Sequence, residues 1–316
     1  MNHAKPRKTF KERMYGLYLS YIPNRRDNIK QIIIKVFFLV SLTVLIISSV
    51  YLANYFLTAN RQDSIINDSR EIWHSALNDS ADAVNKPSED VNALMLKENS
   101  DYKGWITISN TKVDNPIYQT DNNDFYLNHN QQKKKSAYGA LFFDHNNIIT
   151  ENKTDSNLVI YGHNMINGSM FGTLKKFKSL DFYKANPTIE FSTLYKKSTY
   201  KTYAIFVLNA SKADDNGYIY NISRNNFLND DDFNSWVNEA YERSIINTGV
   251  DVELGDNIIT LVTCVNDFDD ARLVIMARET RENEESYVDT SSASVNPSPR
   301  YPKRWYDERG LKYPFD

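Results

Sequence analysis

The sequence contains one cysteine, Cys264, among its 316 residues. A disulfide within the chain needs two thiols, and a CxxC or four-cysteine metal site needs more, so these are excluded. We also find no Gly-rich phosphate loop, no paired-histidine metal motif and no internal repeat. We therefore expect no metal ion and no cofactor.

The chain also lacks a strong net charge, at −3, and nothing in it indicates a nucleic-acid partner. The charge is unevenly placed, however. Residues 1–35 carry nine Lys and Arg against two acids, about +7, which leaves about −10 for residues 36–316. The basic segment suits an anionic inner membrane leaflet.

Residues 36–57 form a run of 22 uncharged, mostly apolar residues, enough for one membrane-spanning helix. Because positive flanks stay inside, we expect residues 1–35 in the cytoplasm and residues 36–57 as a signal-anchor in the cell membrane. The bulk of the chain is then extracellular. A cleaved signal peptide is the alternative, but its apolar region is normally shorter, and no clear small-x-small site follows before Tyr55.

Residues 58–100 have the spacing of two amphipathic helices, broken near residues 85–87. After Gly104 the apolar runs become short and are mostly separated by turn residues, which predicts a mostly antiparallel barrel or sandwich. The eight candidate strands are Trp105–Ile108, Pro116–Gln119, Ala140–Phe143, Leu158–Tyr161, Thr188–Phe191, Tyr200–Leu208, Ile258–Thr263 and Arg272–Ala277.

Two helical stretches interrupt these strands. Residues 169–180 predict one or two helical turns. Residues 230–246 predict a longer helix, because its acidic start suits the helix dipole and its apolar residues share one face. We interpret that face as core packing; it consists of Phe233, Trp236, Val237, Ala240 and Tyr241.

Cys264 ends one apolar run and Arg272 opens the next. A thiol at a strand end with a guanidinium one hairpin away is a candidate nucleophile with an anion partner. The alternative is a buried small hydrophobe. A nucleophilic thiol needs a base or an activating charge, for which the histidines are the candidates.

His163 is the favoured base, because it follows an apolar strand and a glycine that lets the backbone turn sharply. His145 also follows a strand and remains the alternative. We interpret His129 as a loop residue and His74 as a solvated helix residue. His3 is expected on the cytoplasmic side of the membrane, away from Cys264.

A TLxTC motif with a downstream arginine, an upstream YGHNM and a GSMF helix start form a specific combination in this chain. With these motifs the sequence resembles the sortases, cysteine transpeptidases that attach proteins to Gram-positive cell walls, and specifically class B. The resemblance runs from about Leu96 to about Ala277, carried by residues 104–108, 115–122, 126–130, 139–144, 161–165, 168–171, 260–264 and 271–272. It implies an eight-stranded sortase-type β-barrel over residues 101–280, with N-terminal helices over residues 58–100 and an extra helix before the cysteine strand.

The resemblance makes Cys264 the nucleophile, His163 the general acid and base, and Arg272 the group that stabilises the oxyanion or positions the substrate. It leaves structural roles for His145 and His129. Three neighbouring residues are candidates for substrate binding or support: Asn164, Thr263 and Asp267.

The implied reaction cleaves an Asn-Pro-x-Thr type motif in the C-terminal sorting signal of a secreted protein. The thioacyl-enzyme then passes the protein to an amine of peptidoglycan or its lipid-linked precursor. A pilin lysine is the alternative acceptor within the family. A plain cysteine peptidase and a non-catalytic surface-binding module are the alternatives outside it.

Residues 281–316 continue beyond the expected last strand. Their Ser/Pro-rich stretch, residues 290–299, is typical of a disordered tail. The end is unusually aromatic for disorder, and the alternative hypothesis is that it docks on the barrel, across the substrate groove. The aromatic residues are Tyr301, Trp305, Tyr306, Tyr313 and Phe315.

Overall fold

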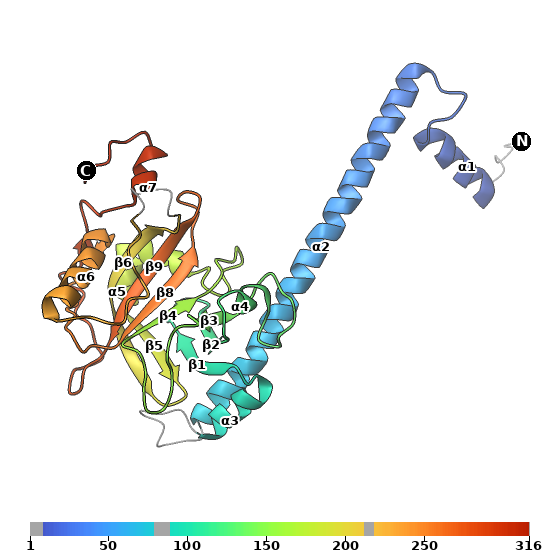
Figure 1. Cartoon of the computed structure of the whole chain (residues 1–316). Coiled ribbons are helices and arrows are strands. Elements are labelled where there is room, and N and C mark those ends of the chain that lie inside the picture. Colours follow the sequence, from blue (N-terminus) through green and yellow to red (C-terminus); the bar gives the residue numbers. More distant parts are fainter. Residues whose placement is uncertain (1–8, 79–88, 212–217, 316) are drawn as a thin grey trace, which may run out of the picture. The chain divides into compact units, whose positions relative to one another are not determined.

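The structure, a computed structural model, describes residues 9–78, 89–211 and 218–315 (Figure 1). The chain divides into two units, Met1–Gln62 and Asp63–Asp316. Helix α2 (Ile29–Asn78) begins in the first unit and ends in the second. The helix break predicted near residues 85–87 lies outside the described residues.

The first unit consists of helix α1 (Phe10–Tyr21) and the N-terminal part of α2. Thr9 and Glu12 form a capping box at the start of α1, in which each side chain accepts from the other's backbone N–H. Helix α2 is long and apolar enough to cross a membrane, with a mean hydropathy of 2.5 in its apolar window. None of that window is buried, unlike a core helix of a soluble protein.

The second unit is built around a closed barrel of eight strands in the order β1-β2-β3-β4-β8-β9-β6-β5 (Figure 1). The strands are β1 (Tyr102–Thr107), β2 (Asp114–Tyr118), β3 (Leu141–Phe143), β4 (Asn157–Tyr161), β5 (Thr188–Thr193), β6 (Lys197–Asn209), β8 (Ile258–Cys264) and β9 (Ala271–Glu279). All eight predicted strands are confirmed. The pairing is antiparallel except for β2 with β3 and β4 with β8, which are parallel.

The central strands are buried on both faces. Along β6, Ile205 and Val207 belong to the main core, whereas Phe206 and Leu208 belong to a second cluster, as the two-residue period of a strand requires. Helix α6 (Asp230–Arg243) supplies the cover for the second cluster (Figure 1). The long apolar runs of β6, β8 and β9 follow from this two-sided burial.

Helix α6 confirms the helix predicted over residues 230–246, although it ends three residues earlier, where Ser244 turns to an extended backbone. The Asn229 side chain caps its start by accepting from Asp232 N at 3.0 Å. Its apolar face packs in the core as predicted, with Phe233, Trp236, Val237 and Ala240 buried and Tyr241 partly buried.

The end of α2 and helix α3 (Glu89–Glu98) contribute to a third cluster with the strands β1 and β2. Trp73 stacks on Trp105 with ring centroids 4.9 Å apart. Next to this pair, His74 Nε2 lies 2.9 Å from the Asp114 carboxylate. The prediction that His74 is simply solvated missed this contact, because it arises only when α2 lies against β1 and β2.

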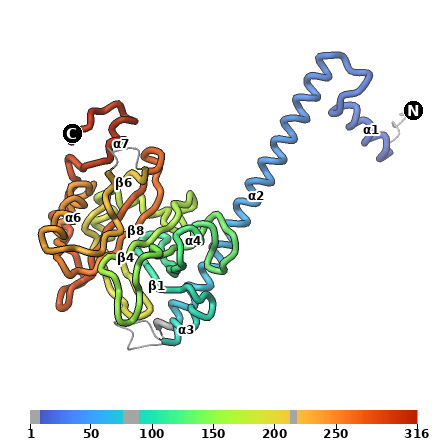
Figure 2. The backbone as a smooth tube through the Cα atoms, in the orientation of Figure 1, coloured from blue at the N-terminus to red at the C-terminus, as the bar shows by residue number. Residues whose placement is uncertain are grey.

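Shorter elements complete the unit. They are α4 (Phe125–Asn128), the 3₁₀ helix η1 (Leu174–Lys178), α5 (Leu180–Ala185), β7 (Ile246–Asn247), β10 (Ser294–Val295) and α7 (Lys303–Asp307). The one or two helical turns predicted over residues 169–180 correspond to η1 and the start of α5. The C-terminal segment pairs β10 with β7 and then runs past α6 to α7 (Figure 2).

Candidate active site

Three neighbouring strands bring the three candidate catalytic residues to one end of the barrel. The parallel pairing of β4 with β8 ends at Tyr161 opposite Val262, and His163 and Cys264 each lie two residues further on. On the other side of β8, Cys264 is the register partner of Arg272 in β9. Cys264 therefore lies between the chain that carries His163 and the strand that carries Arg272.

These three residues line one cavity of about 750 Å³. The Cys264 side chain is exposed, so the alternative of a buried small hydrophobe is wrong. Most of the cavity wall is aliphatic or aromatic, formed by Leu127, Phe142, Tyr161, Leu208, Ile219, Tyr220, Ile222 and Val262. A mostly apolar cleft with a few convergent polar groups is typical of a ligand site.

The ring of His163 is oriented by the backbone. Its Nε2 lies 2.8 Å from the carbonyl oxygen of Leu127, which can only accept, so Nε2 carries a hydrogen. Nδ1 is left as the nitrogen that can exchange a proton. The turn before it requires Gly162, because a Cβ there would lie 2.4 Å from Leu141 Cδ2.

The other described histidines lie away from this cavity. His145 Nδ1 is 3.5 Å from the Asp144 carboxylate, and His129 stacks on Phe125 while its Nδ1 bonds to the carbonyl oxygen of Phe125 at 2.9 Å. Each therefore has a local structural partner. His163 is the histidine that the structure brings together with Cys264.

The guanidinium of Arg272 is lightly held. Its Nη1 donates to the carbonyl oxygen of Ala271 at 3.1 Å, and its Nη2 lies 3.9 Å from the carboxylate of Asp270, whose side chain is about half exposed. Arg272 also lines the cavity. Since a guanidinium has five N–H donors, most of them remain available to a bound molecule.

The three supporting candidates have different positions. Thr263 is buried at the cavity and donates from Oγ1 to the carbonyl oxygen of Gly162 at 2.7 Å, which ties β8 to the turn that carries His163. Asn164 forms an isolated bridge with Met170. Asp267 pairs with Lys178 at 2.5 Å, in the loop between β8 and β9. Neither Asn164 nor Asp267 lines the cavity.

The sequence did not indicate the wall formed by residues 219–222. This wall is held by the fully buried Asn157, whose Nδ2 donates to the carbonyl oxygens of Ile222 and Arg224 at 2.8 and 3.0 Å. Thr260 Oγ1 in turn donates to Asn157 Oδ1 at 2.8 Å. An asparagine at the start of an apolar run gives no sign of partners some 65 residues away.

A tyrosine of the wall is held by a buried carboxylate. The Tyr161 hydroxyl donates to Asp144 Oδ2 at 3.0 Å, and Asn123 Nδ2 donates to the same oxygen at 3.2 Å. Burial, with the Asp144 charge beside it, raises the pKa of Tyr161 above its usual value. Tyr161 therefore remains a neutral hydroxyl at physiological pH.

No group of three or more His, Cys, Asp or Glu side chains within residues 9–78, 89–211 and 218–315 is placed to hold a metal ion. The polar groups that line the cavity include the thiol of Cys264, the imidazole of His163 and the guanidinium of Arg272.

Comparisons with known proteins agree on one family. The family model described as the sortase domain matches residues 106–280. Sortase B of Listeria monocytogenes is 34% identical over 186 residues, which cover 58% of this chain and 72% of that protein. Sortase B of Staphylococcus aureus is 31% identical over 184 residues, or 58% and 71% of the two chains. The X-ray structure of Clostridium perfringens sortase B is 36% identical with a TM-score of 0.54, covering 60% of this chain and all of that one.

Proposed function

Because this chain belongs to the sortase family of transpeptidases, and its relatives are class B members, we propose that it cleaves a C-terminal Asn-Pro-x-Thr type sorting motif and transfers the protein to a cell-wall amine. The observation that carries this proposal is the alignment of His163, Cys264 and Arg272 on three adjacent chain segments around one cavity.

In the proposed reaction, the Cys264 thiolate attacks the carbonyl carbon of the motif's threonine. The peptide C–N bond then breaks, the leaving amine takes a proton from His163, and a thioester remains on the enzyme. An amine next attacks the thioester, His163 takes up its proton, and the thiolate is released. The acceptor is an amine of peptidoglycan or of its lipid-linked precursor.

The contacts of His163 support proton transfer through one of its two ring nitrogens. Nε2 is committed to the carbonyl oxygen of Leu127, so Nδ1 gives and takes the proton in each half of the reaction. Arg272 stays charged throughout, which suits it to stabilise the tetrahedral oxyanion and excludes it as the base. Its register position opposite Cys264 supports this role, because it puts the two side chains on neighbouring strands.

We assign supporting rather than catalytic roles to the neighbouring candidates. Thr263 holds the Gly162 carbonyl and so fixes the spacing of β8 and the His163 turn. Asp267 anchors the loop that leads to Arg272 through Lys178. Asn164 closes the turn after His163 through its bridge to Met170.

We further propose that α2 is an uncleaved anchor, with the basic N-terminus in the cytoplasm and the second unit outside the cell. Its unburied apolar window and the charge of about +7 before residue 36 support this orientation. Anchoring keeps the enzyme in the plane where membrane-retained substrates and wall precursors meet, which raises their effective concentration.

The proposal is tested with the full-length protein in detergent micelles and a library of quenched peptides that contain Asn-Pro-x-Thr-x. We expect cleavage directly after threonine, identified by fragment mass, and none by Cys264→Ala or His163→Gln. Peptides with alanine in place of the threonine are the matched substrate control. If no member of the library is cut and the wild-type thiol resists alkylation, a non-catalytic binding module is favoured instead.

A further inference from the structure

The C-terminal segment contacts both flanks of the catalytic cavity. It is first fixed by β10, which pairs with β7, and by Asn296, whose N and Nδ2 donate to the carbonyl oxygens of Ile245 and Ser244 at 2.9 and 2.8 Å. These bonds anchor the segment directly after α6. From this point it runs along α6 and on to the loop between β8 and β9 (Figure 2).

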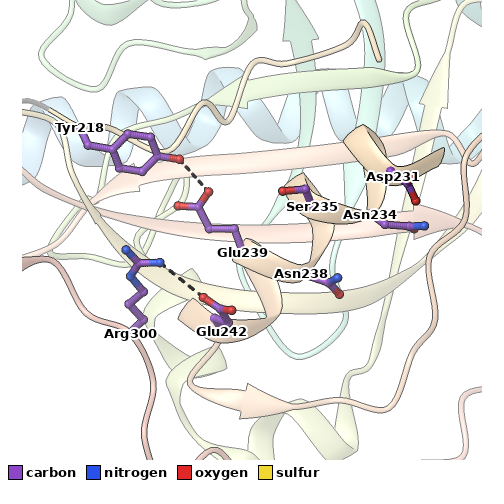
Figure 3. A pocket seen from close by; sticks show the side chains of 8 residues that line it. All are labelled: Tyr218, Asp231, Asn234, Ser235, Asn238, Glu239, Glu242 and Arg300. Atoms are coloured by element: carbon purple, nitrogen blue, oxygen red, sulfur yellow. Dashed lines mark hydrogen bonds and ion pairs between the residues drawn. The ribbon is translucent and has the colours of Figure 1, made fainter. Parts of the chain in front are cut away.

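The first contact is Arg300 with α6. The backbone N–H of Arg300 donates to the carbonyl oxygen of Glu242 at 2.8 Å, and its guanidinium lies 3.4 Å from the Glu242 carboxylate (Figure 3). One turn earlier on the same helix, Glu239 accepts from the Tyr218 hydroxyl at 2.7 Å (Figure 3). Glu239 also accepts from Arg243 at 2.5 Å. The guanidinium carbon of Arg243 in turn lies over the ring of Tyr220, 5.7 Å from the ring centroid.

The C-terminal segment also lies next to two residues of the catalytic cavity wall. Tyr313 and Phe315 of the segment line a second cavity of about 440 Å³, together with Leu208 and Tyr220. Leu208 and Tyr220 also line the catalytic cavity. The same two side chains therefore face the catalytic cavity on one side and the C-terminal segment on the other.

The second contact is with the loop of residues 265–270, which connects Cys264 to Arg272. Tyr301 and Trp305 stack at 4.2 Å and pack against the main core, to which Val265 and Phe268 of this loop belong. Arg304 lies 3.4 Å from the Asp269 carboxylate, which is 92% exposed. An exposed ion pair contributes only about 0–1 kcal/mol, so the packing of Tyr301 and Trp305 against the core contributes more to holding the segment in place.

We propose that residues 294–315 form a clasp that holds the Tyr220 wall and the loop of residues 265–270 at the spacing needed for catalysis, with Trp305 as its principal positioning residue. The inference rests on the proposed function and adds a role for a segment beyond the sortase match, which ends at residue 280. Arg272 needs this support, because the polar contacts of its guanidinium within the described part of the chain are one carbonyl at 3.1 Å and one carboxylate at 3.9 Å.

A clasp of this kind acts on the transition state more than on substrate binding. A small misplacement of a catalytic group can lower the rate by about 100-fold. Loosening the loop should therefore lower kcat about tenfold or more and leave KM within about twofold, the pattern of an interaction made in the transition state.

The experiment compares Trp305→Ala, a deletion of residues 299–316 that keeps β10, and Trp305→Phe, all in the full-length protein in micelles. Tyr287→Ala is the matched control, because Tyr287 is a C-terminal aromatic that is 72% exposed. Peptide cleavage gives kcat and KM, and hydrogen exchange gives the opening of residues 265–271 and 218–224. Exchange in β9 reports whether a variant has unfolded as a whole.

We expect Trp305→Ala and the deletion to lower kcat and to speed exchange in both segments, with Trp305→Phe and Tyr287→Ala close to wild type. If hydrogen exchange in the two segments is unchanged in these variants, the clasp is overturned. This readout does not depend on peptide cleavage, so it still decides if the wild type cleaves no peptide and the proposed function has failed. Faster exchange with unchanged kcat overturns the positioning role. Higher activity after the deletion also overturns it, because the segment would then be a cover. If Trp305→Ala unfolds, the deletion decides by the same criteria.

Discussion

Cys264 and Arg272 are directly opposite each other in the antiparallel ladder of β8 and β9. Side chains of opposed residues project from the same face of a sheet, with Cβ atoms about 5 Å apart. In the proposed reaction, the carbonyl attacked by the Cys264 sulfur would therefore develop its negative charge within reach of the guanidinium. This relationship ties the position of the oxyanion partner to strand register, which a loop could not do as firmly.

Replacing Arg272 should lower the rate of cleavage without unfolding the protein. We expect Arg272→Gln to reduce kcat/KM by about 10²–10³, the effect of losing an oxyanion donor. Arg272→Lys should recover little of this, because an ammonium group does not reproduce the planar fork of N–H donors. Steady-state cleavage of the sorting peptide measures both, and full activity of Arg272→Lys would contradict a role for the fork.

Asn157 should be important for stability as well as for the cavity wall. Its replacement by alanine removes the donor to the carbonyl oxygens of Ile222 and Arg224 and leaves the buried Thr260 hydroxyl without its acceptor, at a cost of about 1–3 kcal/mol for each buried group left unpaired. For a domain of this size, a loss of about 3 kcal/mol lowers Tm by about 6–12 °C.

Thr260→Val is the matched control for Asn157→Ala, because it removes one donor to Asn157 and leaves the wall bonds in place. We expect Thr260→Val to lower Tm less than Asn157→Ala does. Tryptophan fluorescence recorded during heating measures Tm for both variants. If Asn157→Ala melted at the wild-type temperature, the wall would not depend on these hydrogen bonds.

The Glu284 carboxylate should stabilise the fold in a pH-dependent way. It accepts from the buried Arg278 and from Lys201, and these bonds hold its pKa well below the usual range. A lowered folded-state pKa adds stability above the unfolded-state value of about 4.3, and this contribution is lost as pH falls toward the folded-state pKa.

Glu284→Gln should therefore cost about 2 kcal/mol at pH 7, the scale of hydrogen bonds to charged groups. The difference in Tm between the two proteins should narrow below about pH 4, where the carboxylate begins to lose its advantage over the amide. Thermal unfolding of both proteins at pH 7 and at successively lower pH values measures this difference in Tm. A difference that stays constant or widens on acidification would mean that the carboxylate charge is not what stabilises Arg278.

Membrane topology can be read from the single thiol. Cys264 is the one cysteine in the sequence and its side chain is exposed. If the second unit is extracellular, a membrane-impermeant maleimide should label the protein in intact cells, and Cys264→Ala should remain unlabelled. Labelling that appears only after lysis would reverse the proposed orientation.

Much of the fold could be predicted, because alternation and turn residues are local signals. All eight strands and α6 were identified, although β6 extends from Lys197 to Asn209, further than the predicted Tyr200–Leu208. Most of the extra length comes from polar residues at the N-terminal end of β6. They pair with β5 through backbone hydrogen bonds, which the side-chain pattern does not predict.

The pair Cys264 and His163 could be proposed from strand ends and a glycine, but the contacts that orient them could not. The partner of His163 Nε2 is a backbone carbonyl 36 residues away, and Asp267 pairs with a lysine 89 residues away. Such contacts follow from how strands close into a barrel. The tertiary fold decides them, and the local sequence carries no trace of them.

The central claim is a thioacyl-enzyme that is resolved by an amine. The most direct measurement is mass spectrometry of the full-length protein after incubation with an Asn-Pro-x-Thr-x peptide, with and without a diaminopimelate-containing or glycine peptide. The account predicts an acyl adduct on Cys264 that is converted to an amide product when the amine is present and is absent from Cys264→Ala. An adduct that water resolves at the same rate with or without either amine would contradict it and indicate a cysteine peptidase.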